Sequence, residues 1–219
     1  MKTKAVLFDL DGTLLNTLED ITDGCNEALK QFGYTTKSVE EIRLAVGNGF
    51  RRLVEQIIPQ GKENPIFEQV YEAAHSAYAK CSRNKTKPYE GILQAMQNLK
   101  QKNILMGIIS NKPDEQVKEL STIFFSDFVK PEASVGEKES EGIRRKPYPD
   151  SVFSVMKFLG TSKEETVYVG DSDVDITTAK NAGLKCISVT WGFRPRNFLL
   201  EHGATSLIDF PLDLIKALD

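Results

Sequence analysis

The sequence predicts an α/β protein in which a Rossmann-like, doubly wound parallel sheet carries an inserted α-helical domain. Short apolar runs of a strand's length alternate with segments of a helix's length, which is the order of βαβ units. One stretch near the N-terminus breaks this alternation, because its apolar residues recur only at helical spacing. The length of 219 residues suits one full-sized domain with a smaller companion.

Four apolar runs are the candidate strands of the sheet. The first stops at Asp9 and Gly12, as a buried strand does when it ends in a polar loop. The other three also lead into polar residues, and the four runs cover residues 4–8, 104–109, 166–169 and 186–189. Because doubly wound sheets bind ligands at the carboxyl ends of their strands, we expect the polar residues that follow these runs to meet.

Helical segments of a crossover's length separate the later strands. They cover residues 89–101, 114–124, 149–159 and 174–182. The last two are closed by Gly160 and Gly183, which suit the left-handed conformation just past a helix end. The charged segment 136–146 has no periodicity, so we predict an exposed, mobile loop there.

The inserted domain is predicted over residues 16–85, which leaves residues 1–15 and 86–219 for the core. Apolar residues at spacings of three and four begin at Leu18, and the run ends at Gly33. Ser38 and Glu41 form a capping box for a second helix, and further helices are expected at 50–58 and 65–81. The insertion directly follows the first strand, so we predict that it covers the ligand site.

Charge and composition exclude several classes of protein. Twenty-eight Lys and Arg against 31 Asp and Glu give a net charge of -3, and no segment is basic enough to favour nucleic acid. Cys25, Cys81 and Cys186 are too scattered for a disulfide framework or a zinc site. No apolar stretch has the length of a signal sequence or a membrane span. We therefore expect a cytoplasmic monomer or homodimer without nucleic-acid or membrane partners.

Four polar clusters stand out in the sequence, three of them directly after the first three predicted strands and the fourth at the end of the segment 136–146. The clusters are Asp9-Leu10-Asp11-Gly12-Thr13, Ser110-Asn111-Lys112, Lys146-Pro147-Tyr148-Pro149 and Gly170-Asp171-Ser172-Asp173-Val174-Asp175. Each cluster alone also fits a turn or a helix cap. Together they supply a carboxylate nucleophile, a second carboxylate, a hydroxyl donor, an ammonium group and a site for a hard cation.

This combination resembles the haloacid dehalogenase superfamily, whose motifs are DxDGT, a Ser or Thr after the second strand, a lysine commonly followed by PxP, and GDxxxD. The insertion occupies the position of that family's C1-type cap. Within the superfamily the chain is similar to the phosphoglycolate phosphatase branch, through VGNG at residues 46–49 and PYEG at residues 88–91. The resemblance implies a phosphatase that acts on a small phosphorylated metabolite such as 2-phosphoglycolate.

The same resemblance, read with the chemistry of phosphoryl transfer, implies the catalytic roles. Asp9 is the nucleophile that forms an aspartyl phosphate. Asp11 gives a proton to the leaving group and then activates water. Mg²⁺ is expected at Asp9, the backbone carbonyl of Asp11 and Asp171.

The remaining motif residues are expected to support the transfer. Ser110 and Asn111 bind phosphoryl oxygens, and Lys146 offsets the charge that develops on them. Asp175 lies outside the metal's own ligands and orients bound water or Lys146. Arg51 and Arg52 in the insertion are either solvated helix residues or contacts for a substrate carboxylate, and the sequence does not separate these two interpretations.

Several other functions remain open at the level of the motifs. An inorganic pyrophosphatase or a β-phosphoglucomutase-like phosphotransferase of the same superfamily would share them all. A dehalogenase is disfavoured, because its chemistry does not need the second acid, Asp11. A non-catalytic phospho-receiver domain also combines an acceptor Asp, a hydroxyl, a Lys and Mg²⁺, but it places its acids differently and carries no cap. A long-lived aspartyl phosphate without turnover would indicate the receiver.

Overall fold

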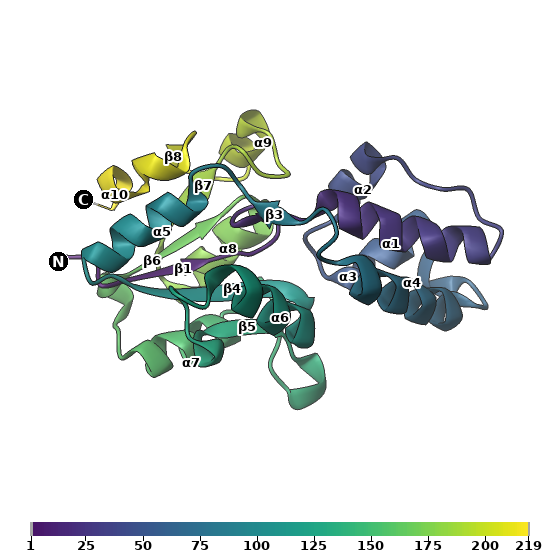
Figure 1. Ribbon diagram of the computed structural model, residues 1–219, viewed down its shortest axis with the longest axis horizontal. Coiled ribbons are helices and arrows are strands. Elements are labelled where there is room, and N and C mark those ends of the chain that lie inside the picture. The colour runs from purple at the N-terminus through teal and green to yellow at the C-terminus, as the bar shows by residue number, and fades with distance from the viewer. Residues whose placement is uncertain (1, 219) are drawn as a thin grey trace. The chain divides into compact units, whose positions relative to one another are not determined.

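The computed structural model describes residues 2–218, and they form two compact units that are drawn in Figure 1. One unit combines Met1–Leu15 with Pro88–Asp219, and the other is Asn16–Lys87. The chain passes between the units through two short strands that pair with each other, β2 (Leu15–Asn16) and β3 (Lys87–Pro88). No helix within residues 2–218 is long and apolar enough to cross a membrane.

The first unit is built on a six-stranded sheet in the order β5-β4-β1-β6-β7-β8, and every pair of neighbouring strands is parallel. The strands are β1 (Ala5–Phe8), β4 (Leu105–Pro113), β5 (Ser134–Glu137), β6 (Thr166–Gly170), β7 (Lys185–Val189) and β8 (Leu207–Ile208). β1 lies between β4 and β6, where the chain order reverses. A doubly wound sheet binds its ligands at such a reversal, so the fold places the loop after β1 at the expected site.

Helices cover both faces of this sheet, as in a doubly wound fold (Figure 1). They are α5 (Ile92–Gln101), α6 (Asp114–Phe125), α7 (Asp150–Leu159), α8 (Asp173–Ala182), α9 (Arg196–Glu201) and α10 (Leu214–Ala217). All four residues of β1 are buried, and its apolar side chains join one core with those of β4 and β6. The predicted α/β class with a doubly wound parallel sheet is confirmed.

The structure differs from the sequence-based expectation at several elements. β5 and β8 were not predicted, because β5 is only four residues long and contains a glycine and two polar residues, and β8 has only two residues. β4 continues through Ser110-Asn111-Lys112, which were expected beyond its end, because these polar side chains are buried. The predicted loop 136–146 begins inside β5 and ends at the buried Lys146, so it is not exposed throughout. α5 begins at Ile92 rather than at 89, after Gly91 with φ +86°.

The second unit contains four α-helices, α1 (Leu18–Gln31), α2 (Val39–Ala45), α3 (Phe50–Ile57) and α4 (Phe67–Cys81). The capping box of Ser38 and Glu41 is present at the start of α2. Asp20 of α1 is fully buried, and its carboxylate accepts hydrogen bonds from the backbone N–H groups of Lys85 and Thr86 at 2.8–3.0 Å. This contact ties the end of the unit to its first helix.

Helices α1 and α4 approach closely at Gly24. A Cβ atom built on Gly24 would lie 2.6 Å from the Cα atom of Tyr78, which is closer than real side chains allow. We expect Gly24→Ala to destabilise the protein by about 1–3 kcal/mol, because overpacking outweighs the gain of about 1 kcal/mol in helix propensity. Thermal unfolding measures the effect, with Glu27→Ala on the exposed side of α1 as the matched control. An unchanged or raised melting temperature would show that α1 and α4 move apart enough to accommodate the added methyl group at little cost.

Candidate active site

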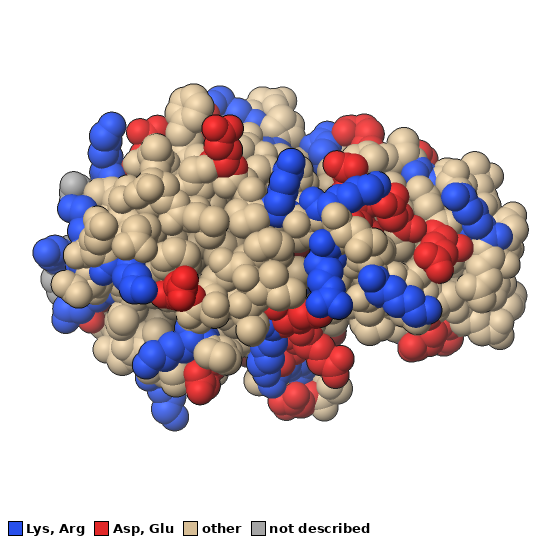
Figure 2. Space-filling view, in the orientation of Figure 1, with Lys and Arg blue, Asp and Glu red and all other residues tan. Residues whose placement is uncertain are grey.

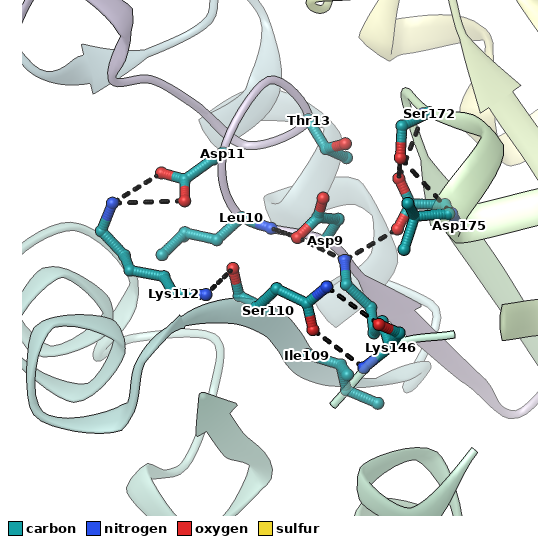
Figure 3. A network of polar contacts seen from close by, with 12 residues as sticks. Asp9, Leu10, Asp11, Thr13, Ile109, Ser110, Lys112, Lys146, Ser172 and Asp175 are labelled. Atoms are coloured by element: carbon teal, nitrogen blue, oxygen red, sulfur yellow. Dashed lines mark hydrogen bonds and ion pairs between the residues drawn. The ribbon is translucent and has the colours of Figure 1, made fainter. Parts of the chain in front are cut away.

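The polar residues singled out in the sequence of the first unit gather at the carboxyl ends of β1, β4 and β6 (Figure 3). Asp9 and Asp11 come from the loop after β1, and Ser110 and Asn111 from the end of β4. Lys146 comes from the segment between β5 and α7. Asp171 follows β6, and Asp175 lies in the first turn of α8. Parallel strands end at one edge of a sheet, which brings these distant segments together.

Asp9 is held at the centre of this group. Its Oδ1 atom accepts a hydrogen bond from the backbone N–H of Leu10 at 2.7 Å and lies 2.9 Å from the Lys146 ammonium nitrogen. Burial raises the pKa of Asp9 well above its ordinary value, and the nearby Asp175 and Asp171 raise it further, while Lys146 opposes them. An additional positive charge would therefore favour the ionised, nucleophilic form of Asp9.

Lys146 is positioned through both its backbone and its side chain. The side-chain amide of Asn111 accepts a hydrogen bond from the Lys146 backbone N–H at 2.8 Å and donates one to its carbonyl oxygen at 3.1 Å. The ammonium nitrogen lies 2.8 Å from Asp175 as well as 2.9 Å from Asp9. Burial opposes the charge on Lys146, but Asp175 and Asp9 outweigh it and hold the pKa well above its ordinary value. Lys146 is thus a fixed cation, and the Asn111 amide holds it.

Asp171 is fixed by two hydrogen bonds, one to each oxygen. Thr13 donates its hydroxyl to Oδ1 at 3.0 Å, and the backbone N–H of Phe193 donates to Oδ2 at 2.7 Å. Burial raises the pKa of Asp171 to about 7, and Asp175 raises it while these two hydrogen bonds lower it. A Cβ atom at Gly12 or Gly192 would collide with the Asp171 side chain, so the loops around this carboxylate close tightly upon it.

Asp175 joins the site to the start of α8. Its Oδ2 atom accepts hydrogen bonds from the backbone N–H and the hydroxyl of Ser172, which close a capping box. Its Oδ1 atom accepts from Lys146 and, at 3.3 Å, from the Tyr168 hydroxyl. Asp175 is completely buried, and all of these contacts orient it toward Lys146 (Figure 3).

Three carboxylates of the site form a group that fits a hard divalent cation. Asp9, Asp171 and Asp175 each offer an oxygen, and these oxygens lie within 4.8 Å of one another. All three residues are buried, and Lys146 offsets only part of their charge. Oxygen donors from buried carboxylates are what Mg²⁺ and Ca²⁺ select. The donor set thus supports a divalent-metal site here, and its chemistry matches the predicted ligands Asp9 and Asp171.

The Asp11 carboxylate contacts Lys112, a residue to which the sequence assigned no role. The Lys112 ammonium nitrogen lies 2.9 Å and 3.2 Å from the two oxygens of the Asp11 carboxylate (Figure 3). The Lys112 backbone N–H donates to the Ser110 hydroxyl oxygen at 3.3 Å. The indole N–H of Trp191 donates to the Thr13 carbonyl oxygen at 3.0 Å, a contact that the sequence did not indicate. The triplet SNK was visible in the sequence, but nothing there indicated which carboxylate the lysine meets.

Arg51 and Arg52 of the second unit both have acidic partners. Arg51 forms an ion pair with Glu68 and lies over the rings of Phe67 and Tyr71. Arg52 lies 2.5 Å from Glu55. These contacts agree with the interpretation of solvated helix residues, which the sequence had left open. On the face drawn in Figure 2, basic and acidic side chains are intermingled rather than gathered by sign.

Comparison with known proteins identifies the family. Residues 6–189 match the family described as haloacid dehalogenase-like hydrolase, which is most of the chain. The chain belongs to this hydrolase family. The matched range of this hydrolase contains the predicted site residues of the first unit, from Asp9 to Asp175.

Curated relatives of this hydrolase agree with that assignment. Phosphoglycolate phosphatase 1 of Pseudomonas aeruginosa is 31% identical, over 99% of this chain and 80% of the relative. Phosphoglycolate phosphatase of Aquifex aeolicus is 30% identical, over 99% of this chain and 97% of the relative. A candidate phosphoglycolate phosphatase from Lactobacillus delbrueckii subsp. bulgaricus has a crystal structure that superposes with a TM-score of 0.91. The two sequences are 37% identical, and the superposition covers 100% of this chain and 99% of the Lactobacillus chain. This hydrolase is a phosphatase that acts on phosphoric monoesters.

Proposed function

We propose that this phosphatase hydrolyses a small phosphate monoester, 2-phosphoglycolate, in a Mg²⁺-dependent reaction through an aspartyl phosphate on Asp9. The observation that carries the proposal is the placement of Asp9 at the carboxyl end of the central strand. There it contacts Lys146 and lies beside Asp171 and Asp175. The similarity to relatives named phosphoglycolate phosphatase supports the choice of ester.

The proposed reaction uses two carboxylates in turn. An oxygen of Asp9 attacks phosphorus, the bond from phosphorus to the ester oxygen breaks, and Asp11 gives its proton to the leaving alkoxide. Asp11 then takes a proton from water, which attacks the aspartyl phosphate and releases inorganic phosphate. Lys146 and the Ser110 hydroxyl offset and hold the charge on the phosphoryl oxygens. Asn111 acts through Lys146, whose backbone its amide holds.

The metal is assigned to the carboxylate group described above. Asp9, the backbone carbonyl of Asp11 and Asp171 would hold Mg²⁺, and Asp175 would orient Lys146. When bound, Mg²⁺ reduces the repulsion between the attacking carboxylate and the phosphoryl group. The raised pKa of Asp9 supports this assignment, because the buried carboxylate needs a cation to stay ionised.

The choice among esters is assigned to the inserted unit. The groups of the core site contact only the phosphoryl group and the metal, which all candidate esters share. We therefore propose the domain division 1–15 with 86–219 and 16–85, in which the helical part serves as the family's cap. The net charge of -3 and the intermingled charges on the face drawn in Figure 2 support a small-molecule substrate and no nucleic-acid partner. We also propose that the protein is cytoplasmic and is a monomer or a homodimer.

A comparison of esters tests the proposed substrate. We expect kcat/KM with Mg²⁺ to be higher for 2-phosphoglycolate than for hexose phosphates, and about tenfold or more higher than for pyrophosphate. Acid-quenched samples should carry a phosphoryl group on Asp9 during turnover. Isomerisation of glucose 1-phosphate, or faster hydrolysis of pyrophosphate, would overturn the substrate and leave the phosphoryl transfer intact. A phosphoenzyme that persists without turnover would indicate a receiver domain instead.

A further inference from the structure

Lys112 is a buried cation placed against the proposed acid and base of the reaction. Its side chain is 3% exposed and that of Asp11 is 13% exposed. The Lys112 nitrogen lies within 3.2 Å of both Asp11 oxygens, at 2.9 Å from Oδ1 and 3.2 Å from Oδ2. A single ammonium group therefore fixes the direction of the carboxylate plane (Figure 3).

A purely stabilising role explains this placement poorly. Removing two charges from water costs free energy that their attraction only partly recovers, and apolar residues of similar size often stabilise a fold as well or better. Lysine also loses much side-chain freedom when it is held in one geometry. The pair of Lys112 with Asp11 is thus better explained by the orientation that it gives to Asp11.

Lys112 also contacts Ser110, which is proposed to bind phosphoryl oxygens. Its backbone N–H donates a hydrogen bond to the hydroxyl oxygen of Ser110 on the same strand. The Lys112 backbone is therefore held on β4, which is itself hydrogen-bonded to β1. Asp11 lies in the loop that follows β1, so the two residues of this contact come from the ends of neighbouring strands.

We propose that Lys112 is a positioning residue that orients the Asp11 carboxylate for proton transfer. The inference rests on the function proposed for Asp11. A general acid must lie within hydrogen-bond reach of the leaving oxygen, and a carboxylate that rotates freely occupies such a geometry only part of the time. When Asp11 is protonated for the first step, its carbonyl oxygen keeps the contact with the ammonium group, and its hydroxyl oxygen turns to the leaving oxygen and carries the proton to it.

The dependence of the rate on the leaving group tests this role. Lys112→Met keeps the length of the side chain and removes its charge. We expect kcat for 2-phosphoglycolate, whose alkoxide needs a proton, to fall about 10- to 100-fold. The pre-steady-state burst with p-nitrophenyl phosphate, whose phenolate leaves without a proton, should change by less than about threefold. Lys112→Arg restores the cation and should recover part of the lost alkyl-ester turnover.

Two controls separate positioning from a general loss of structure. Lys130→Met removes an exposed lysine and should leave both substrates unaffected. In an Asp11→Asn background, Lys112→Met should change the alkyl-ester kcat by less than about twofold, because a residue that acts through Asp11 has nothing left to orient. The double variant also leaves no buried carboxylate unpaired. If Lys112→Met does not fold, Lys112→Arg gives the same comparison, with the alkyl-ester rate lowered more than the aryl burst.

Three results would decide against the proposal. An equal loss for both esters would assign Lys112 to general stability or phosphate binding. A loss of the same factor in the Asp11→Asn background would show that Lys112 acts independently of Asp11. An alkyl-ester kcat unchanged by Lys112→Met would remove the role altogether. Failure of the proposed function is seen separately, because Asp11→Asn itself would then lower the alkyl-ester kcat and the aryl-ester burst equally.

Discussion

Asp9→Asn is expected to abolish turnover while the fold persists. The amide has nearly the shape of the carboxylate but cannot form an acyl phosphate, so we expect kcat to fall by about 1,000-fold or more. No phosphoryl group should appear on residue 9 after acid quenching. Mass spectrometry of quenched samples and a steady-state assay measure these two results.

The stability of the Asp9→Asn variant provides its control. Burial raises the pKa of Asp9. Without a bound metal ion, the folded protein therefore loses stability as pH rises from the ordinary Asp range toward this raised pKa. A neutral amide removes that cost, and the metal-free variant should melt at the same temperature as the natural protein or higher at neutral pH. Retained activity above about a tenth of the natural rate would assign the nucleophile to another residue.

Loss of the Asp171 carboxylate is expected to have the second largest effect. Asp171→Asn keeps an acceptor for Thr13 or Phe193 but offers a metal ion much less charge. We expect the apparent Mg²⁺ affinity to fall about 100-fold or more, with activity partly recovered at high Mg²⁺ concentration. Calorimetric Mg²⁺ titration and the Mg²⁺ dependence of kcat measure the change. Chelation should likewise remove the activity of the natural protein, and added Mg²⁺ should restore it.

Asp173→Asn is the matched control for this metal prediction. Asp173 lies two residues further along the same motif, is only partly buried, and is outside the carboxylate group of Asp9, Asp171 and Asp175. Its substitution should change the Mg²⁺ affinity by less than about threefold. Equal effects of the two substitutions, or activity that survives exhaustive chelation, would show that the metal is held elsewhere or is not required.

The sequence was sufficient for the main elements of the sheet because their signals are local. Residues 5–8 form an unbroken apolar run, and β1 is buried on both faces as such a run requires. β5 escaped detection, since Ser134–Glu137 has Val135 as its single large apolar residue and acquires its strand conformation by pairing with β4. The short β8 depends in the same way on β7. Tertiary context decides such segments, and sequence periodicity does not contain it.

The site residues were predictable as chemical types, but their pairings were not. Strand ends in one parallel sheet predict that Asp9, Ser110 and Asp171 share one edge. Whether Asp175 orients bound water or Lys146, and whether Lys112 contacts Asp11, depends on side-chain directions that residue types do not determine. The Asn111 amide illustrates the same limit, since the sequence did not indicate its two hydrogen bonds with the Lys146 backbone. The binding of phosphoryl oxygens by Asn111 stays a prediction.

The central position of β1 has a consequence for how the chain folds as it is synthesised. β1 emerges first, but its neighbours in the sheet are much later segments, since Ala5 pairs with Leu105 and with Thr166. Asn16–Lys87, in contrast, is one continuous stretch whose four helices pack on one another. The helical unit can therefore complete its contacts on the ribosome while β1 is still unpaired. Nucleation of the sheet must wait for distant contacts, which is a slow step governed by loop-closure entropy.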